Sequence, residues 1–267
     1  MTDFIARERL AEDIAAIGVR HGDTVMVHAA ISRIGRMIEG PDTLIAALAD
    51  VLGTEGTLVG YADWNTDYEE LADAEGRVPA EWRAGILPFD PASARAIRHN
   101  GSFPEFLRGW PGTIRSANPG AGVVARGARA AWLTADHAID YGYGPASPFA
   151  KLVEAEAKVL MLGAPRDTLT LLHHAEHLAD IPRKRIRRLE VPFVTPAGTE
   201  WRMTEEYDTA DPVHIELADD YFGTIVDDFV AAGGGREGLI GKAPSLLLEA
   251  APLVAFAVQW IERQDLA

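Results

Sequence analysis

The chain has 267 residues, of which 48% are hydrophobic and 24% charged, the composition of a globular protein large enough for a substantial core. Acidic residues outnumber basic ones by 40 to 25, and the formal net charge of -15 disfavours nucleic acid and favours cations as partners. The absence of cysteine excludes disulfides, thiolate metal sites and a thiol nucleophile. No apolar run approaches the ~18–20 residues of a bilayer span, and the first ten residues are already charged, so we expect a cytoplasmic protein without a membrane partner.

Helices and buried strands alternate over the first sixty residues. Apolar residues at helical spacing predict a helix over 7–17, ended by Gly18, and a second helix over 43–52. Apolar runs of strand length over 23–28 and 57–61 predict two buried strands. This alternation is typical of an α/β fold.

The pattern breaks over 62–100, where polar and aromatic residues follow no period. We interpret this stretch as a long excursion from the core, and long ordered loops are usually functional. Beyond it we expect a helix over 103–108 and a strand over 123–125. A further helix is expected over 149–156, with Ser147 as its N-cap.

The last part of the chain contains several further elements. They are a strand over 158–162, a long helix over 168–181, a hairpin over 188–204, a helix over 218–231, a short apolar segment over 246–248 and a helix over 254–263. We interpret 186–217 as a hairpin subdomain in which Pro192 favours an edge strand. The sequence therefore predicts one domain over 1–267, an α/β layered sandwich with a mixed central sheet covered by helices plus a C-terminal hairpin region.

One helix face gathers side chains suited to catalysis. At 100° per residue, His173, Glu176, His177 and Asp180 lie opposite a stripe of Leu and Ala residues that includes Leu178. Glu176 is three residues after His173, so its carboxylate can hold the imidazole N–H, fix the tautomer and raise the basicity, as a general base requires. The same face also fits the solvated side of an amphipathic helix, or a metal site through its His-x-x-Glu spacing. The helix alone does not decide among these.

Two other positions are candidate ligand sites. His28 ends the first buried strand, where α/β proteins place ligand-binding groups, although a packed histidine fits equally well. Ser147 offers a hydroxyl at a helix start, which suits an anion or carbonyl oxygen as well as ordinary capping. The chain lacks a Gly-x-Gly-x-x-Gly motif, a Walker-type lysine loop and a Gly-x-Ser-x-Gly elbow, so nucleotide hydrolysis and serine-hydrolase chemistry have no support.

Charged residues concentrate in three segments. The acidic ones are Asp63, Glu69, Glu70, Glu205, Glu206, Asp208 and Asp211. If their two segments converge over the histidine helix, they form an acidic cleft for a polycation; otherwise they are solvated charge. The basic run over 183–188 follows a helix C-terminus, where the dipole favours cations, and we interpret it as structural.

Several short motifs occur in the order found in a known family. They are Met26-Val-His28, Gly60-Tyr-Ala-Asp-Trp64, Tyr68-Glu-Glu70, Pro88-Phe-Asp-Pro91, Arg115-Ser-Ala-Asn-Pro119, Ser147-Pro148, Leu162-Gly-Ala-Pro165, Leu172-His-His-Ala-Glu176 and Glu206-Tyr-Asp208. Through them the chain resembles the aminoglycoside 3-N-acetyltransferases over essentially its whole length. The resemblance implies a sandwich distinct from the Gcn5-type acetyltransferase fold. It also implies acetyl transfer from acetyl-coenzyme A to the 3-amino group of a 2-deoxystreptamine antibiotic, which confers resistance.

The resemblance also assigns roles to residues. It places the catalytic histidine on His173 and its paired carboxylate on Glu176. On the coenzyme side it places His28, Ala29, Ala30, Ile31, Ser32, Ser116, Ser147, Leu162 and Gly163. On the acceptor side, which includes the 62–100 excursion, it places Tyr61, Asp63, Trp64, Glu69, Glu70, Glu206 and Asp208. Many relatives carry serine in place of Ala30 and histidine in place of Asn118, which alters contacts expected on the coenzyme side.

Without cysteine no acetyl-thioenzyme can form, so we expect direct transfer in a ternary complex with His173 as general base. The expected partners are coenzyme A and a polycationic aminoglycoside, with no metal, on a monomer or homodimer. Three alternatives stay open. They are an acetyl-coenzyme A-dependent N-acetyltransferase for a different amine, a metal-dependent hydrolase using His173, Glu176 and His177, and a non-catalytic polycation-binding protein.

Overall fold

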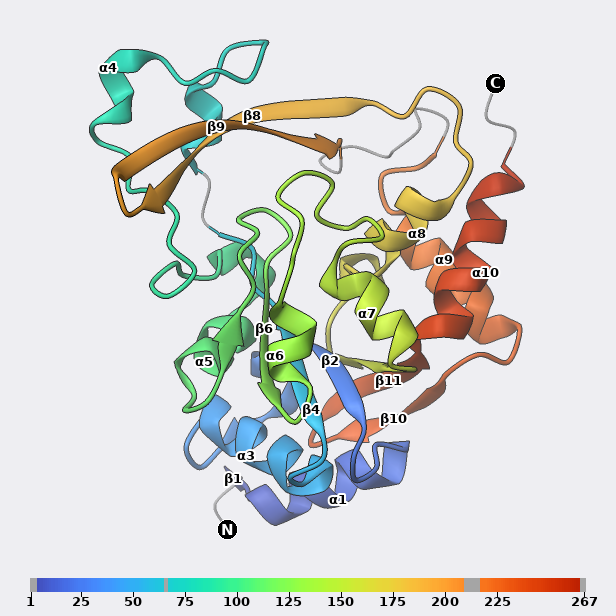
Figure 1. The fold of residues 1–267 in the computed structure, drawn as a ribbon. Helices are drawn as coiled ribbons and strands as arrows, with labels where there is room; N and C mark the ends of the chain where they lie inside the picture. Colours follow the sequence, from blue (N-terminus) through green and yellow to red (C-terminus); the bar gives the residue numbers. More distant parts are fainter. Residues whose placement is uncertain (1–3, 65–66, 209–216, 265–267) are drawn as a thin grey trace.

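A seven-stranded mixed sheet runs through the protein, and a computed structural model describes residues 4–64, 67–208 and 217–264 (Figure 1). In spatial order the strands are β10 (Arg236–Ile240), β11 (Ala243–Glu249), β7 (Lys158–Leu162), β2 (Thr24–Ala29), β4 (Thr57–Tyr61), β6 (Val123–Gly127) and β5 (Ile114–Arg115). The central strand β2 is parallel to both β4 and β7, and the other pairings are antiparallel. The carboxyl ends of three parallel strands therefore meet beside His28.

Both faces of the sheet are covered, because alternate residues of β2 enter two different cores. Val25 and Val27 pack with helices α1 (Arg7–Ile17), α3 (Pro41–Leu52) and α5 (Phe103–Gly109). Met26 packs on the other face, with α6 (Ala130–Thr134), α7 (Pro148–Glu154), α8 (Leu172–Leu178), α9 (Tyr221–Ala231) and α10 (Ala250–Glu262). The predicted α/β layered sandwich with a mixed sheet is confirmed.

A third, smaller core joins the excursion to the hairpin. Strands β8 (Ile186–Thr195) and β9 (Gly198–Tyr207) pair with each other and not with the main sheet. The excursion carries η1 (Asp67–Leu71), α4 (Ala80–Arg83) and η2 (Arg98–Asn100), and Figure 1 shows the hairpin beside α4. Phe89 N–H donates to the Pro192 carbonyl (2.7 Å), and Phe89 packs among Trp64, Tyr68 and Phe193. Residues 65–66 of the excursion and 209–216 of the predicted hairpin subdomain, including Asp211, lie outside the described residues.

Most predicted elements are confirmed, and three of them (7–17, 57–61 and 158–162) have the predicted bounds. Strand β10 and helix α6 were not predicted, nor were η1, α4 and η2 of the excursion. The other missed elements are short: β5, α2 (Ile31–Ile34), η3 (Arg166–Thr168), and β1 (Phe4–Ile5), which pairs with β3 (Arg36–Met37). Within the described ranges, no helix is long and apolar enough to cross a bilayer.

The prediction of one helix over 168–181 is wrong. The chain makes the short η3 turn, runs irregularly through Leu169 to Leu171, and is α-helical only in α8. The helix ends at Leu178, and Ala179 is already extended. The chain does not resume the helix at Ile181, because the residue before Pro182 is disfavoured in the helical conformation. The predicted apolar stripe is buried except at Leu178, which is 47% exposed. On the predicted polar face, Glu176 is 2% exposed and so is buried instead of solvated.

Phe89→Ala is expected to lower the free energy of unfolding by about 3–5 kcal/mol, because it empties the centre of the third core. Phe89 is 1% exposed, and its ring contacts Trp64 and Phe193 at centroid distances of 5.5 and 6.0 Å. Urea denaturation followed by tryptophan fluorescence measures the loss. The control Phe106→Ala, on the exposed side of α5, should cost less than about 1 kcal/mol. Equal losses would contradict an anchoring role for Phe89.

Candidate active site

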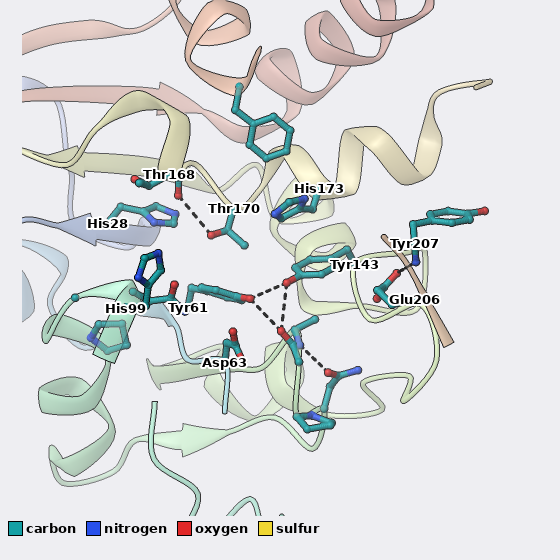
Figure 2. Close-up of a pocket in the computed structure, with 18 of the residues that line it drawn as sticks. His28, Tyr61, Asp63, His99, Tyr143, Thr168, Thr170, His173, Glu206 and Tyr207 are labelled. Carbon is teal, nitrogen blue, oxygen red and sulfur yellow. Dashed lines mark hydrogen bonds between the residues drawn. The ribbon is translucent and has the colours of Figure 1, made fainter. Parts of the chain in front are cut away.

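A cavity of about 860 Å³ lies where the carboxyl ends of β2 and β4 meet the segment before α8 and the β8–β9 hairpin. This is within the usual ~300–1,000 Å³ of small-molecule sites. Figure 2 shows His28 and Thr168 toward one end, Glu206 and Tyr207 toward the other, and His173 between them facing Tyr143. The cavity thus has two ends that meet at one histidine.

His173 belongs to a chain of hydrogen bonds that runs into the core. Its Nδ1 lies 2.6 Å from Oε2 of Glu176, and the Tyr221 hydroxyl donates to Oε1 of the same carboxylate. Against an ionised carboxylate Nδ1 must carry the proton, so Nε2 of the neutral ring is a proton acceptor. None of the described residues hydrogen-bonds to Nε2, and the side chain lines the cavity. This arrangement holds a base in one tautomer.

Aromatic rings fix the plane of the His173 imidazole. The rings of Tyr143 and Phe222 each lie with their centroids 4.8 Å from it. Tyr143 is itself held, because its carbonyl accepts from Nδ1 of His174 (2.7 Å) and its hydroxyl lies 2.6 Å from that of Tyr61. Both rotation and translation of the imidazole are therefore restricted on the cavity side.

Asp63 follows β4 and lies half-buried in the cavity wall. Its Oδ1 has no hydrogen-bond partner among the described residues. Burial, and to a smaller extent the nearby charge of Glu69, raise the pKa of Asp63 to about 8 against the opposing effect of Arg115. The carboxyl is therefore largely protonated at pH 7 until a cation approaches, which would favour the ionised form.

His28 stands at the opposite end of the cavity from Glu206. Its Nε2 also lacks a hydrogen-bond partner among the described residues, and burial lowers the pKa of His28 to about 4. The imidazole is thus neutral at pH 7, with one ring nitrogen available to a ligand. Ala29 and Ala30 beside it keep this end of the cavity open.

The acidic segments do converge on the hairpin end of the cavity, and basic residues accompany them. Glu69 pairs with Arg187, Glu205 with Arg188 (2.7 Å) and Asp208 with Arg185 (3.7 Å). Glu206 Oε1 lies 2.8 Å from Nε2 of His177, without hydrogen-bond geometry. The interpretation of 183–188 as merely structural overlooked these counter-ions. The hairpin register, in which Arg188 is opposite Glu205, was the missing information.

The structure brings eight of the predicted site residues to the cavity: His28, Ala29, Ala30, Tyr61, Asp63, Glu69, His173 and Glu206. Glu176 lies directly behind His173. The other predicted site residues do not line the cavity. On the coenzyme side, Ile31 and Ser32 lie in α2, and Leu162 is buried at the end of β7 beside Gly163. On the acceptor side, Trp64 is in the third core, Glu70 is exposed and Asp208 faces Arg185. Sequence reasoning assigned no role to Tyr143, Phe222, Arg187 or His99, which do line the cavity. His99 lies in the 62–100 excursion and Arg187 in the basic run over 183–188, both of which the sequence had singled out. Tyr143 lies in a stretch rich in turn formers over 140–148.

Ser116 and Ser147 are fully buried and hold loops instead of lining the cavity. Ser147 accepts from Ala150 N–H (3.3 Å), which confirms its N-cap role. Ser116 Oγ lies 2.9 Å from Nδ1 of His137 and accepts from Val123 N–H. Asn118, which does line the cavity, donates to the carbonyl of Ala138 (2.7 Å). These residues shape the cavity wall through the backbone.

The geometry bears on the alternative of a metal-dependent hydrolase that uses His173, Glu176 and His177. Over residues 4–64, 67–208 and 217–264, no three His, Asp or Glu side chains come together as possible metal ligands. His177 packs against Tyr207, with ring centroids 4.5 Å apart, whereas His173 packs against Tyr143 and Phe222.

Comparisons with known proteins relate the chain to one family. The family model described as aminoglycoside 3-N-acetyltransferase matches residues 26–262. Aminoglycoside N(3)-acetyltransferase III of Pseudomonas aeruginosa is 46% identical, over 95% of this chain and 92% of its own. The solved AAC-IIIb in binary complex with CoASH is 63% identical, with a TM-score of 0.97 over 98% of this chain and 97% of its own. AAC-VIa bound to sisomicin is 33% identical, with a TM-score of 0.93 over 98% of this chain and 99% of its own.

These matches, with the fold, define the chain as an acyltransferase enzyme built on an α/β sandwich that is not of the Gcn5 type. It belongs to the aminoglycoside 3-N-acetyltransferase family, and the resemblance drawn from its motifs is confirmed.

Asp63→Asn is expected to change how stability depends on pH. The folded pKa of about 8 exceeds the ordinary 3.8, so between these values the folded chain keeps a proton that the unfolded chain releases. The associated stabilisation is complete below about pH 4 and is lost as the pH rises to about 8. The melting temperature of the variant, relative to wild type, should therefore rise between about pH 5.5 and 8.5.

Differential scanning fluorimetry of the ligand-free protein measures this trend. Asp50→Asn, which removes an exposed carboxylate of α3 paired with Arg7, is the matched control and should keep the wild-type trend. A constant difference between Asp63→Asn and wild type across this range would show that Asp63 does not titrate there.

Proposed function

We propose that the protein transfers an acetyl group from acetyl-coenzyme A to the 3-amino group of a 2-deoxystreptamine aminoglycoside. It acts in the cytoplasm and confers resistance to the antibiotic on the cell that makes it. The observation that carries the proposal is His173, which lines the cavity with its Nδ1 held by the buried Glu176. AAC-IIIb in complex with CoASH and AAC-VIa bound to sisomicin support the two ligand classes.

The two ends of the cavity suit these two ligands. Five carboxylates and one guanidinium are among the described residues that line it, and they favour a polycation. Four of the carboxylates (Asp63, Glu69, Glu205 and Glu206) belong to the excursion and the hairpin. The His28 end has small side chains and a neutral imidazole with a free nitrogen, which suit the acetyl-bearing arm of coenzyme A. His173 lies where the two would meet.

His173 then takes part in two proton transfers: it first accepts a proton and later donates it. His173 Nε2 accepts a proton from the attacking amine as the new C–N bond forms, and Glu176 stabilises the imidazolium. The C–S bond breaks, and the proton returns from His173 to the sulfur of the departing coenzyme A thiol. Because the chain has no cysteine, both substrates are held together and no thioenzyme forms.

His173→Ala is expected to lower the rate of acetyl transfer by ~10²–10⁴-fold, because it removes the general base. Thiol release from acetyl-coenzyme A measures the rate, and calorimetry should still detect antibiotic binding. His21→Ala, an exposed histidine outside the cavity, serves as control. Near-normal turnover in His173→Ala would contradict the assignment.

Glu176→Gln is expected to lower kcat at least about tenfold with little change in KM, because the amide can donate to Nδ1 and favour the wrong tautomer. Tyr221→Phe keeps the carboxylate and removes one of its two hydrogen bonds, so its loss should be smaller. Separate measurement of kcat and KM for both variants tests this order. An unchanged kcat in Glu176→Gln would leave Glu176 with a purely structural role.

Thiol release across a panel of aminoglycosides and simple amines tests the proposal as a whole, with NMR of the product to locate the acetyl group. An N-acetyltransferase for another amine would release thiol with that amine only. A polycation-binding protein would bind antibiotic and release no thiol, and a metal-dependent hydrolase would lose activity to chelators. Expression in a sensitive strain, with the minimal inhibitory concentration as readout, tests the role in resistance.

A further inference from the structure

One ion pair in the cavity wall stands where the antibiotic is proposed to bind. Arg187 of β8 pairs with Glu69 of η1, and both residues line the cavity. Arg187 is the only lysine or arginine among the described residues that do so. The pair joins the hairpin to the excursion, 118 positions apart in the chain. Glu69, a cavity-lining carboxylate of the excursion, is thus already paired with a cation.

Two neighbouring carboxylates of the cavity wall, Glu205 and Asp63, are compensated as well. Glu205 accepts from Arg188 and from the Tyr141 hydroxyl (3.1 Å), and burial keeps Asp63 largely protonated at pH 7. The Arg187 side chain is 45% exposed and that of Glu69 20%, so the guanidinium can move to solvent while the carboxylate stays in the wall. The free cavity therefore presents less negative charge than its residues suggest.

We propose that Arg187 is an internal counter-ion, an inference that rests on the proposed function. Its guanidinium pairs with Glu69 at the position that an ammonium group of the aminoglycoside takes when the antibiotic binds. Binding of the antibiotic exchanges one cation for the other and releases the guanidinium toward solvent. The substrate must break an existing pair to form its own. Arg187 therefore lowers the affinity for every cation and leaves only multiply charged acceptors with enough additional contacts to bind, which makes it a specificity-determining residue.

A different role for Arg187 would be to bind a phosphate of coenzyme A, because guanidinium groups recognise phosphates well. Its position disfavours this. Arg187 lies on the hairpin directly opposite Glu206, which also lines the cavity, and this carboxylate repels an anion. Figure 2 shows His28 at the other end of the cavity from Glu206, so an anionic ligand meets less repulsion at the His28 end.

Arg187→Gln tests the proposal directly. The KM for the aminoglycoside should fall about two- to fivefold, the range expected for removal of a partly exposed ion pair, with kcat and the KM for acetyl-coenzyme A unchanged. Calorimetry with the antibiotic alone should show the same fall in Kd. Glu69→Gln should raise the KM, and the gain from Arg187→Gln should disappear in the double variant.

Arg202→Gln is the matched control, because Arg202 is on the same hairpin, pairs with the exposed Glu200 and does not line the cavity. An equal fall in the KM for the aminoglycoside in Arg202→Gln would mean that the fall in Arg187→Gln comes from the change in net charge. A raised antibiotic KM in Arg187→Gln would mean that Arg187 positions Glu69, and a raised acetyl-coenzyme A KM that it binds phosphate. An unchanged KM would give it no role. Each of these results overturns the proposal.

Failure of the proposed function would look different. Wild-type protein would then release no thiol with any aminoglycoside, a result that does not involve Arg187. Melting temperatures of the variants within a few degrees of wild type exclude misfolding as the cause of any change.

Discussion

The active site depends on a carboxylate that is almost completely removed from water. Glu176 is 2% exposed, and an unpaired buried carboxylate costs several kcal/mol. Its two partners come from different helices, His173 from α8 and Tyr221 from α9, so the carboxylate is satisfied only when both helices are docked. Tyr221 in turn stacks on Trp260 of α10 at a centroid distance of 6.3 Å. The orientation of one imidazole is thus tied to the packing of three helices.

The charge of the protein acts locally rather than as a uniform field. A net charge of -15 favours cationic ligands, yet Glu69 and Glu205 at the cavity each pair with an arginine, Arg187 and Arg188 respectively. Asp208, outside the cavity lining, pairs with Arg185 in the same way. Such pairs have modest net energies at partly exposed sites, so they can be exchanged for pairs with a ligand. Affinity for a polycation then depends on how many of these exchanges the ligand completes.

Local patterns predicted the elements of the sheet well. Strands β4 and β7 and helix α1 have their predicted bounds because short apolar runs and glycine stops depend only on neighbouring residues. The same reasoning failed between Thr168 and Ile181. Leu169 and Leu171 are both fully buried, and an irregular turn buries them where a continuous helix was predicted. Packing against α9 and α10 overrode the helical periodicity there.

Local patterns and motifs were enough to predict the α/β class and the family. They also predicted the pairing of His173 with Glu176, because a spacing of three residues in a helix places two side chains together wherever the helix lies. Tertiary structure decided that this pair is buried instead of solvated, that Arg187 meets Glu69, and that Asp63 holds its proton at pH 7. Burial and ion pairing depend on segments far apart in the chain, such as Glu69 and Arg187. No local periodicity encodes contacts of that kind.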